Sequence, residues 1–175
     1  MGSMNVLISA TQIRDRVDEL GAEIAADFHG KKITVVGVLT GCLVFLADLI
    51  RRLNHPLQVA FLEASSYRGT ATTAGTLVVN DGLLTDIQGR HVLLLDDILD
   101  TGNTISTLVN HLKTKGAAEV KTCVLLRKLG RQEVEFEPDY VGFPIPDKFV
   151  VGYGLDFNDE FRHLPFIAVL PDDHA

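Results

Sequence analysis

Three carboxylates and three hydroxyl or amide side chains lie within nine residues in the middle of the chain. Asp96, Asp97 and Asp100 come first, and Thr101-Gly102-Asn103-Thr104 follows directly. Ionised carboxylates accept hydrogen bonds, so Asp96 and Asp97 can each hold one of two adjacent ribose hydroxyls. Their charge also favours a nearby Mg²⁺ ion. The segment therefore predicts a site for a sugar with Mg²⁺ beside it.

The residues after Asp100 have the composition of a phosphate-binding turn. Gly102 lets the backbone approach a ligand closely, and the hydroxyls of Thr101 and Thr104 can donate hydrogen bonds. If a helix begins here, its unpaired N–H groups and the positive end of its dipole face the ligand. We predict that residues 100–104 bind a phosphate group without the help of Lys or Arg.

Other kinds of protein use parts of the same pattern. Such residues can simply cap a helix, but three carboxylates in five residues are more than a cap needs. A P-loop triphosphatase requires G-x-x-x-x-G-K-[ST], and both the first Gly and the Lys are missing here. Asp100-Thr101-Gly102 also matches the catalytic triplet of aspartic proteases, which belongs to an all-β fold and needs a partner aspartate. All three alternatives are disfavoured.

The apolar pattern places the acidic segment at the end of a buried strand. Residues 92–95 are apolar on both faces, as a strand covered by helices on each side must be. Similar runs predict strands at 33–38, 57–62, 76–79 and 120–126, and helical spacing covers 9–30, with a capping box at Ser9 and Gln12, as well as 42–53 and 104–115. Strands that alternate with helices predict an α/β fold, a central parallel sheet flanked by helices. Ligands bind beyond the carboxyl ends of such strands.

Two stretches depart from this alternation. Residues 65–75 are rich in Ser, Thr, Gly and Ala, which predicts a mobile loop. From Phe136 onward Pro, Gly and aromatic residues dominate, so we expect a small C-terminal hood formed mainly by residues 136–175. The chain of 175 residues suits one domain, which we place at residues 5–175, because residues 1–4 resemble an appended leader.

Bulk properties exclude several partners. A net charge of -7 argues against binding of nucleic acid, and the sequence contains neither an apolar run of ~18 residues for a membrane nor a secretory signal pattern. Cys42 and Cys123 lack the spacing of a redox or zinc motif, which favours free, buried thiols in the cytoplasm. The six histidines also lack zinc-ligand spacing.

Two segments carry a resemblance to a known family. Residues 92–104 resemble the phosphoribosyl pyrophosphate (PRPP) motif of type I phosphoribosyltransferases, which is four apolar residues followed by D-D-x-x-D-T-G-x-T. The stretch from Val141 to Asp156, VGFPIPDKFVVGYGLD, resembles the C-terminal signature of hypoxanthine-guanine phosphoribosyltransferases, and Arg162 with Leu164-Pro165 extends it. The resemblance covers nearly the whole chain from about Ile33.

The resemblance implies a type I phosphoribosyltransferase fold and an enzyme of purine salvage. Its reaction would be the Mg²⁺-dependent transfer of the 5-phosphoribosyl group from PRPP to N9 of hypoxanthine or guanine, giving IMP or GMP and pyrophosphate. Xanthine or a pyrimidine remains an alternative acceptor. A regulator that kept the fold but binds RNA is an alternative of another class, although the acidic charge speaks against it. Family analogy also implies a homodimer or homotetramer.

Site roles also follow from the resemblance. Asp100 matches the general acid/base at purine N7, and PRPP with its 5′-phosphate is assigned to Asp96, Asp97, Asp100, Thr101, Gly102, Asn103 and Thr104. Asp96, Asp97 and Asp156 are the implied metal ligands. Lys128, Phe149, Val150 and Asp156 are the implied purine-binding residues. The Lys128 ammonium can donate but never accept, so it should select a 6-oxo base over a 6-amino base, unless it is only a solvated lysine at a strand end.

Two loops complete the implied site. Leu39-Thr40-Gly41 matches the pyrophosphate loop, which in the family has a cis peptide bond and often a Lys at its centre. Thr40 is a departure, so we expect backbone N–H groups to bind there, with Arg162 as a further pyrophosphate contact. Ser66-Tyr67 matches the tip of a closing loop, a lid that would exclude water from the reaction.

Overall fold

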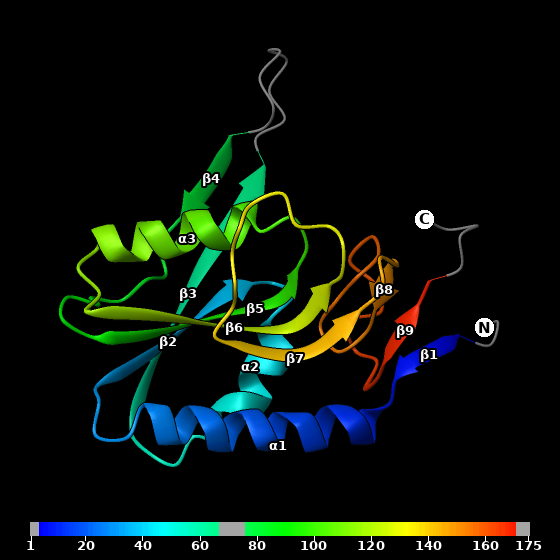
Figure 1. Ribbon diagram of the computed structural model, residues 1–175, viewed down its shortest axis with the longest axis horizontal. Helices are drawn as coiled ribbons and strands as arrows, with labels where there is room; N and C mark the ends of the chain where they lie inside the picture. Colours follow the sequence, from blue (N-terminus) through cyan, green and yellow to red (C-terminus); the bar gives the residue numbers. More distant parts are fainter. Residues whose placement is uncertain (1–3, 67–75, 171–175) are drawn as a thin grey trace.

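Six strands form a central sheet with helices on both faces (Figure 1). The computed structural model describes residues 4–66 and 76–170. The strand order is β4-β3-β2-β5-β6-β7. The strands span β2 Ile33–Leu39, β3 Leu57–Ser66, β4 Leu77–Asn80, β5 His91–Leu99, β6 Glu119–Lys128 and β7 Tyr140–Ile145. Helices α1 (Ala10–Asp27) and α2 (Leu43–Ile50) cover one face, and α3 (Asn103–Thr114) covers the other.

The apolar strands build a core on each side of the sheet, because successive side chains of a strand point to opposite faces. Leu93 and Leu95 of β5 join the core beneath α1 and α2, whereas Val92 and Leu94 join the core beneath α3. The prediction of a strand buried on both faces is confirmed for β5. Its last residues are therefore held firmly at the carboxyl edge of the sheet.

The pairing confirms a parallel core and corrects one edge. Strands β3, β2, β5, β6 and β7 pair in parallel, but β4 pairs with β3 antiparallel. The sheet is thus mixed rather than wholly parallel. A parallel neighbour needs a crossover connection of about a dozen residues or more, usually with a helix. β3 ends at Ser66 and β4 begins at Leu77, so the connection between them is shorter than that.

Local signals at the helix starts are confirmed. Ser9 caps α1: the Gln12 N–H donates to Ser9 Oγ at 3.2 Å, and the Ser9 N–H donates to Gln12 Oε1 at 2.9 Å. Helix α3 begins after Gly102, whose φ of +89° is a conformation that favours glycine. Among the described residues, no helix has both the length and the apolar character that crossing a membrane requires.

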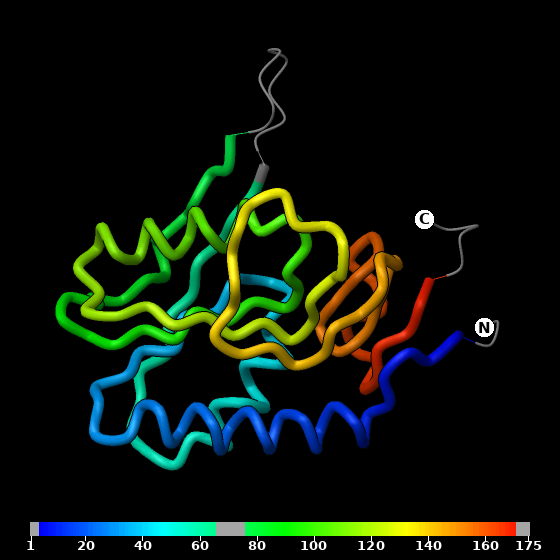
Figure 2. The backbone as a smooth tube through the Cα atoms, viewed as in Figure 1, coloured from blue at the N-terminus to red at the C-terminus, as the bar shows by residue number. Residues whose placement is uncertain are grey.

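A second, smaller sheet forms beside the carboxyl edge of the central one (Figure 2). Its antiparallel strands are β1 (Asn5–Ile8), β9 (Ile167–Val169) and β8 (Val150–Val151), so the start of the chain pairs with its end. Strand β7 lies in the segment expected to be irregular, but it pairs with β6 in the central sheet. Gly142 and Pro144 interrupt the apolar pattern by which a strand is recognised in the sequence. Both residues nevertheless suit this strand, because a Cβ at Gly142 would overlap Leu125 O and proline is tolerated in an edge strand.

Candidate active site

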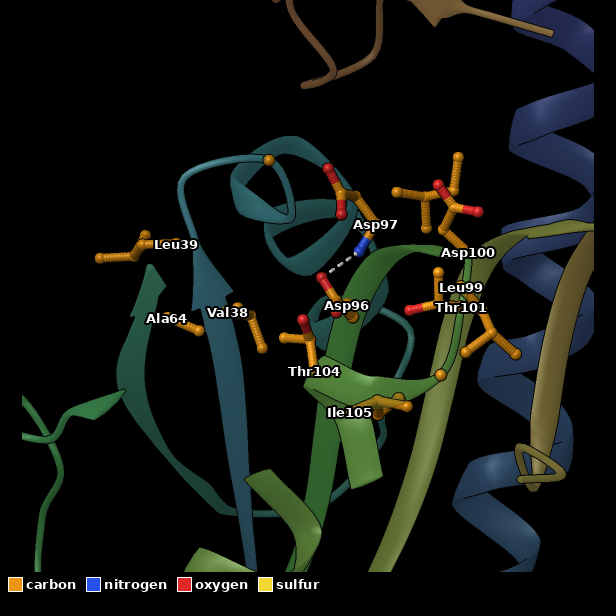
Figure 3. Close-up of a pocket in the computed structure, with 13 residues that line it drawn as sticks. Val38, Leu39, Ala64, Asp96, Asp97, Leu99, Asp100, Thr101, Thr104 and Ile105 are labelled. Atoms are coloured by element: carbon orange, nitrogen blue, oxygen red, sulfur yellow. Dashed lines mark hydrogen bonds between the residues drawn. The ribbon is translucent and has the colours of Figure 1, made fainter. Parts of the chain in front are cut away.

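The carboxyl ends of β2 and β5 border a cavity of about 290 Å³ (Figure 3). These two strands are parallel neighbours, so their ends meet at the same edge of the sheet. The cavity is lined by Val38, Leu39, Gly41, Ala64, Asp96, Asp97, Ile98, Leu99, Asp100, Thr101, Gly102, Thr104 and Ile105. The structure therefore brings most of the predicted sugar and phosphate residues to one cavity wall.

The predicted phosphate turn joins β5 to α3 at this cavity. Thr101 and Thr104 line it together with Gly102, and the first turn of α3 follows. The loop after β6 stabilises the turn, because the N–H groups of Glu133 and Val134 donate to Thr101 O at 2.9 and 3.2 Å. A helix start in this position presents N–H groups and positive dipole to an anion.

Asn103 has a different environment from its neighbours in the turn. Its side-chain amide donates to Thr101 Oγ1 at 3.2 Å and to Glu133 Oε2 at 3.1 Å. The side chain is therefore occupied in fixing the turn.

Asp96 and Asp97 form an adjacent acidic pair on the wall of the cavity. The Asp97 N–H donates to Asp96 Oδ1 at 2.9 Å (Figure 3). Burial raises the pKa of Asp96 well above its ordinary value, and the adjacent charge of Asp97 raises it further. The pKa of Asp97 is also raised, mainly by burial. A ligand that donates hydrogen bonds or carries positive charge would stabilise the ionised pair.

The loop after β2 lies directly against this pair. The peptide bond between Leu39 and Thr40 is cis, as the resemblance implies. A Cβ on Gly41 would overlap the Asp97 carboxylate, and a Cβ on Gly154 of the hood would overlap Gly41 O. The loop is thus held between β5 and the hood. Thr40 is exposed at its outer side.

A second cavity of about 240 Å³ adjoins the first. It is lined by Asp97, Ile98, Asp100, Lys128, Phe149, Val150, Leu155 and Asp156. Asp97, Ile98 and Asp100 line both cavities. Phe149 is 43% exposed, and its ring packs edge-on against that of Phe157, with 5.8 Å between ring centroids. The pocket therefore has the aromatic wall and the few polar groups that a flat heterocycle needs.

Lys128 belongs to this second cavity and not to the solvent. Its side chain is only 13% exposed, which argues against the alternative of a solvated lysine. Its ammonium lies 3.5 Å from Asp147 Oδ1 and 4.0 Å from Asp100 Oδ2. In addition, Arg131 Nε donates to Asp100 Oδ1 at 2.9 Å. The sequence analysis missed Arg131 and Asp147, because no local signal shows that they meet Asp100 and Lys128.

Arg162 and Asp156, which were predicted to bind separate groups, are paired with each other. Arg162 Nη2 lies 3.1 Å from Asp156 Oδ1, and Arg162 Nη1 donates to Gly154 O at 2.7 Å. Arg162 lines a third cavity, of about 510 Å³, between the hood and the helices α1 and α2. Asp156 remains on the wall of the base-sized cavity.

The fit of a divalent metal can be judged from the donors. Over residues 4–66 and 76–170, no three metal-ligating side chains come together, so Asp96, Asp97 and Asp156 do not form a complete cage. Mg²⁺, however, typically uses one or two carboxylates together with water and substrate phosphates. The acidic pair at the cavity wall fits a metal that arrives with a phosphate-bearing substrate.

The predicted lid lies at the limit of the described chain. Ser66 is the last residue of β3. Two residues earlier in the same strand, Ala64 lines the first cavity. Tyr67 falls outside the described residues. The role of Ser66-Tyr67 as a lid therefore stays a prediction.

The fold and the site together define a type I phosphoribosyltransferase. The features that define it are the acidic pair at the carboxyl edge of the sheet, the phosphate-binding turn that contains a glycine, and the hood. In agreement, the family model "Phosphoribosyl transferase domain" matches residues 9–158. The chain belongs to the hypoxanthine-guanine phosphoribosyltransferase family. Enzymes of this family generally need a divalent metal.

Individual relatives match over almost the whole chain. The hypoxanthine-guanine phosphoribosyltransferase of Streptococcus pneumoniae is 40% identical over 96% of this chain and 93% of its own length. That of Aquifex aeolicus is 42% identical over 97% and 96%. A crystal structure of the hypoxanthine phosphoribosyltransferase of Staphylococcus aureus has a TM-score of 0.90 at 36% identity, covering 97% of this chain and 92% of that chain.

Proposed function

We propose that this protein transfers the 5-phosphoribosyl group of PRPP to N9 of hypoxanthine or guanine, producing IMP or GMP and pyrophosphate. The observation that carries this proposal is the joining of two cavities at Asp100. One has the donors for a sugar phosphate, and the other has an aromatic wall and a buried lysine. Identity of about 40% to the curated enzymes over nearly the full length supports the same reaction.

The residues divide the substrate between them. We assign the 5′-phosphate to the turn at Asp100–Thr104, the ribose hydroxyls to Asp96 and Asp97, and the pyrophosphate to the backbone of Leu39-Thr40-Gly41 with Arg162. As pyrophosphate leaves, positive charge develops on the ribose ring. Both carboxylates line the cavity and Asp96 is buried, so they are placed to stabilise that charge without reorganisation.

The base would lie in the second cavity. Phe149 offers its ring as a stacking surface, Val150 its backbone and Lys128 its ammonium to the 6-oxo group. Asp100 lines both cavities, so it can accept the proton from purine N7 as N9 attacks the sugar. The contacts position both reactants and stabilise charge, which together account for most of the catalysis in such a transfer.

We infer that the metal is Mg²⁺, because carboxylate oxygens and phosphates are its preferred ligands. Asp96, Asp97 and Asp156 would hold it directly or through water. When bound, it neutralises the charge of the pyrophosphate group.

Two further features concern the setting of the enzyme. Cys42 and Cys123 are free and buried, which supports work in the reducing cytoplasm. By family analogy, we infer a homodimer or homotetramer here.

A panel of free bases tests the proposed function. With PRPP and Mg²⁺, hypoxanthine and guanine should give nucleotide and pyrophosphate, and xanthine measures how far the pocket tolerates a second oxo group. Adenine should react at least about 10²-fold more slowly, because its 6-amino group cannot accept a hydrogen bond from the buried Lys128 ammonium. Product identification by mass distinguishes the outcomes. Equal rates with adenine, or turnover of a pyrimidine alone, would contradict the proposal.

A further inference from the structure

Four charged side chains form a closed ring on the rim of the base cavity. Asp100 and Asp147 alternate with Lys128 and Arg131. Each carboxylate faces Lys128 with one oxygen, Asp147 at 3.5 Å and Asp100 at 4.0 Å. Each faces Arg131 with its other oxygen, Asp100 at 2.9 Å and Asp147 at 3.8 Å. The ring thus balances two positive and two negative charges.

Two members of this ring must stay apart for the proposed reaction. In a 6-oxopurine, O6 and N7 lie side by side on one edge of the base. Lys128 would donate to O6 while Asp100 accepts from N7. A direct pair between Lys128 and Asp100 would occupy both groups, and the base would have to break it in order to bind.

The geometry weakens that pair. Lys128 lies closer to Asp147 than to Asp100, and Arg131 already holds the opposite oxygen of Asp100. Asp147 stands two residues before Phe149, within a turn closed by a hydrogen bond of 2.8 Å from Lys148 N–H to Pro146 O. The carboxylate that restrains Lys128 and the ring that would stack on the base therefore come from one short segment.

We propose that Asp147 is a positioning residue that determines base specificity, by drawing the Lys128 ammonium away from Asp100 and directing it at position 6 of the purine. Arg131 completes the arrangement by fixing the Asp100 carboxylate. The proposal rests on the proposed function, since it assigns Lys128 and Asp100 to the base.

Asp147→Asn tests this with little change of shape. Without the charge at position 147, Lys128 is drawn to Asp100, and base binding must disrupt that pair. We expect the KM for hypoxanthine to rise about tenfold. This is less than the roughly 10²-fold that a displacement of a contacting group by roughly 1 Å can cost. The KM for PRPP should stay within about twofold, and the preference for hypoxanthine over adenine should fall by about the same tenfold factor.

Two further variants separate positioning from folding. Asp147→Glu keeps the charge on a half-exposed side chain and should restore the KM for hypoxanthine to within about threefold of the wild-type value. Asp15→Asn removes a carboxylate that also pairs with an arginine, Arg14 at 3.4 Å, but on helix α1 away from the base cavity. It should leave both KM values and the base preference unchanged.

The outcomes distinguish this inference from the proposed function. If wild-type protein converts hypoxanthine and Asp147→Asn behaves like Asp15→Asn, the role of Asp147 is refuted while the proposed function stands. The role is equally refuted if Asp147→Asn raises the KM for PRPP as much as the KM for hypoxanthine, or if Asp147→Glu fails to restore the latter. Absence of hypoxanthine turnover in the wild-type protein would refute the proposed function itself.

Discussion

Asp100→Ala is expected to lower kcat for nucleotide formation by about 10²–10⁴, the range typical of losing a general acid or base. Asp100 lines both cavities, so its carboxylate can face the purine and the sugar phosphate together. PRPP should still bind, because the turn at Thr101–Thr104 and the pair Asp96 and Asp97 remain. Initial rates with saturating substrates give kcat, and calorimetric titration of the variant gives its affinity for PRPP.

Asp100→Asn is the matched variant for this prediction. It keeps the shape of the side chain and a hydrogen-bond acceptor, but it cannot take up a proton at neutral pH. If proton transfer is the role of Asp100, the asparagine variant should be slowed nearly as much as the alanine variant. Turnover that is unchanged in Asp100→Ala would remove Asp100 from the mechanism.

Gly41→Ala is expected to weaken PRPP binding by about 10²-fold, as a misplacement of roughly 1 Å at a catalytic site can. An added Cβ would overlap the Asp97 carboxylate, and the close approach of Gly154 to Gly41 O leaves the loop little room to retreat toward the hood. The Asp97 carboxylate, at the free end of its side chain, is therefore the group that must move. Calorimetry measures the affinity, and thermal melting checks that the variant is folded.

Gly82→Ala is the control for this change. Gly82 lies in the turn after β4, and a Cβ there would come no closer than 3.2 Å to Asn80 Oδ1. Its PRPP affinity should equal that of the wild-type protein. A Gly41→Ala variant that binds PRPP equally well would show that contact between the loop and Asp97 has no part in substrate binding.

The parts of the site that sequence could predict are those encoded locally. Asp96 and Asp97 lie in the last part of one buried strand, the turn at Asp100–Thr104 follows it, and the strand pattern places them at a sheet edge. Lys128 was assigned from the family resemblance, and the structure places it beside Asp100, because β5 and β6 pair in parallel with Leu99 opposite Arg127. The capping box and the glycine before α3 are local signals of the same kind.

The parts that sequence could not predict depend on contacts between distant segments. Nothing near Gly41 in the chain indicates that Asp97 and Gly154 close around it. Likewise, the pairing of β1 with β9 joins the two ends of the described chain, and a short alternating pattern cannot specify its partner. The ring that includes Arg131 and Asp147 is assembled from three separate segments, so its members resemble ordinary surface charges until the fold brings them together.

The central claim is that the cavity between the acidic pair, the glycine turn and the loop after β2 binds PRPP. Calorimetric titration of the wild-type protein with PRPP in the presence of Mg²⁺ measures this directly, without any base. We predict a saturable heat signal with one site per chain, and loss of that signal when excess pyrophosphate and IMP occupy the cavity beforehand. A titration that yields no heat beyond dilution, with protein that melts cooperatively, would contradict the account.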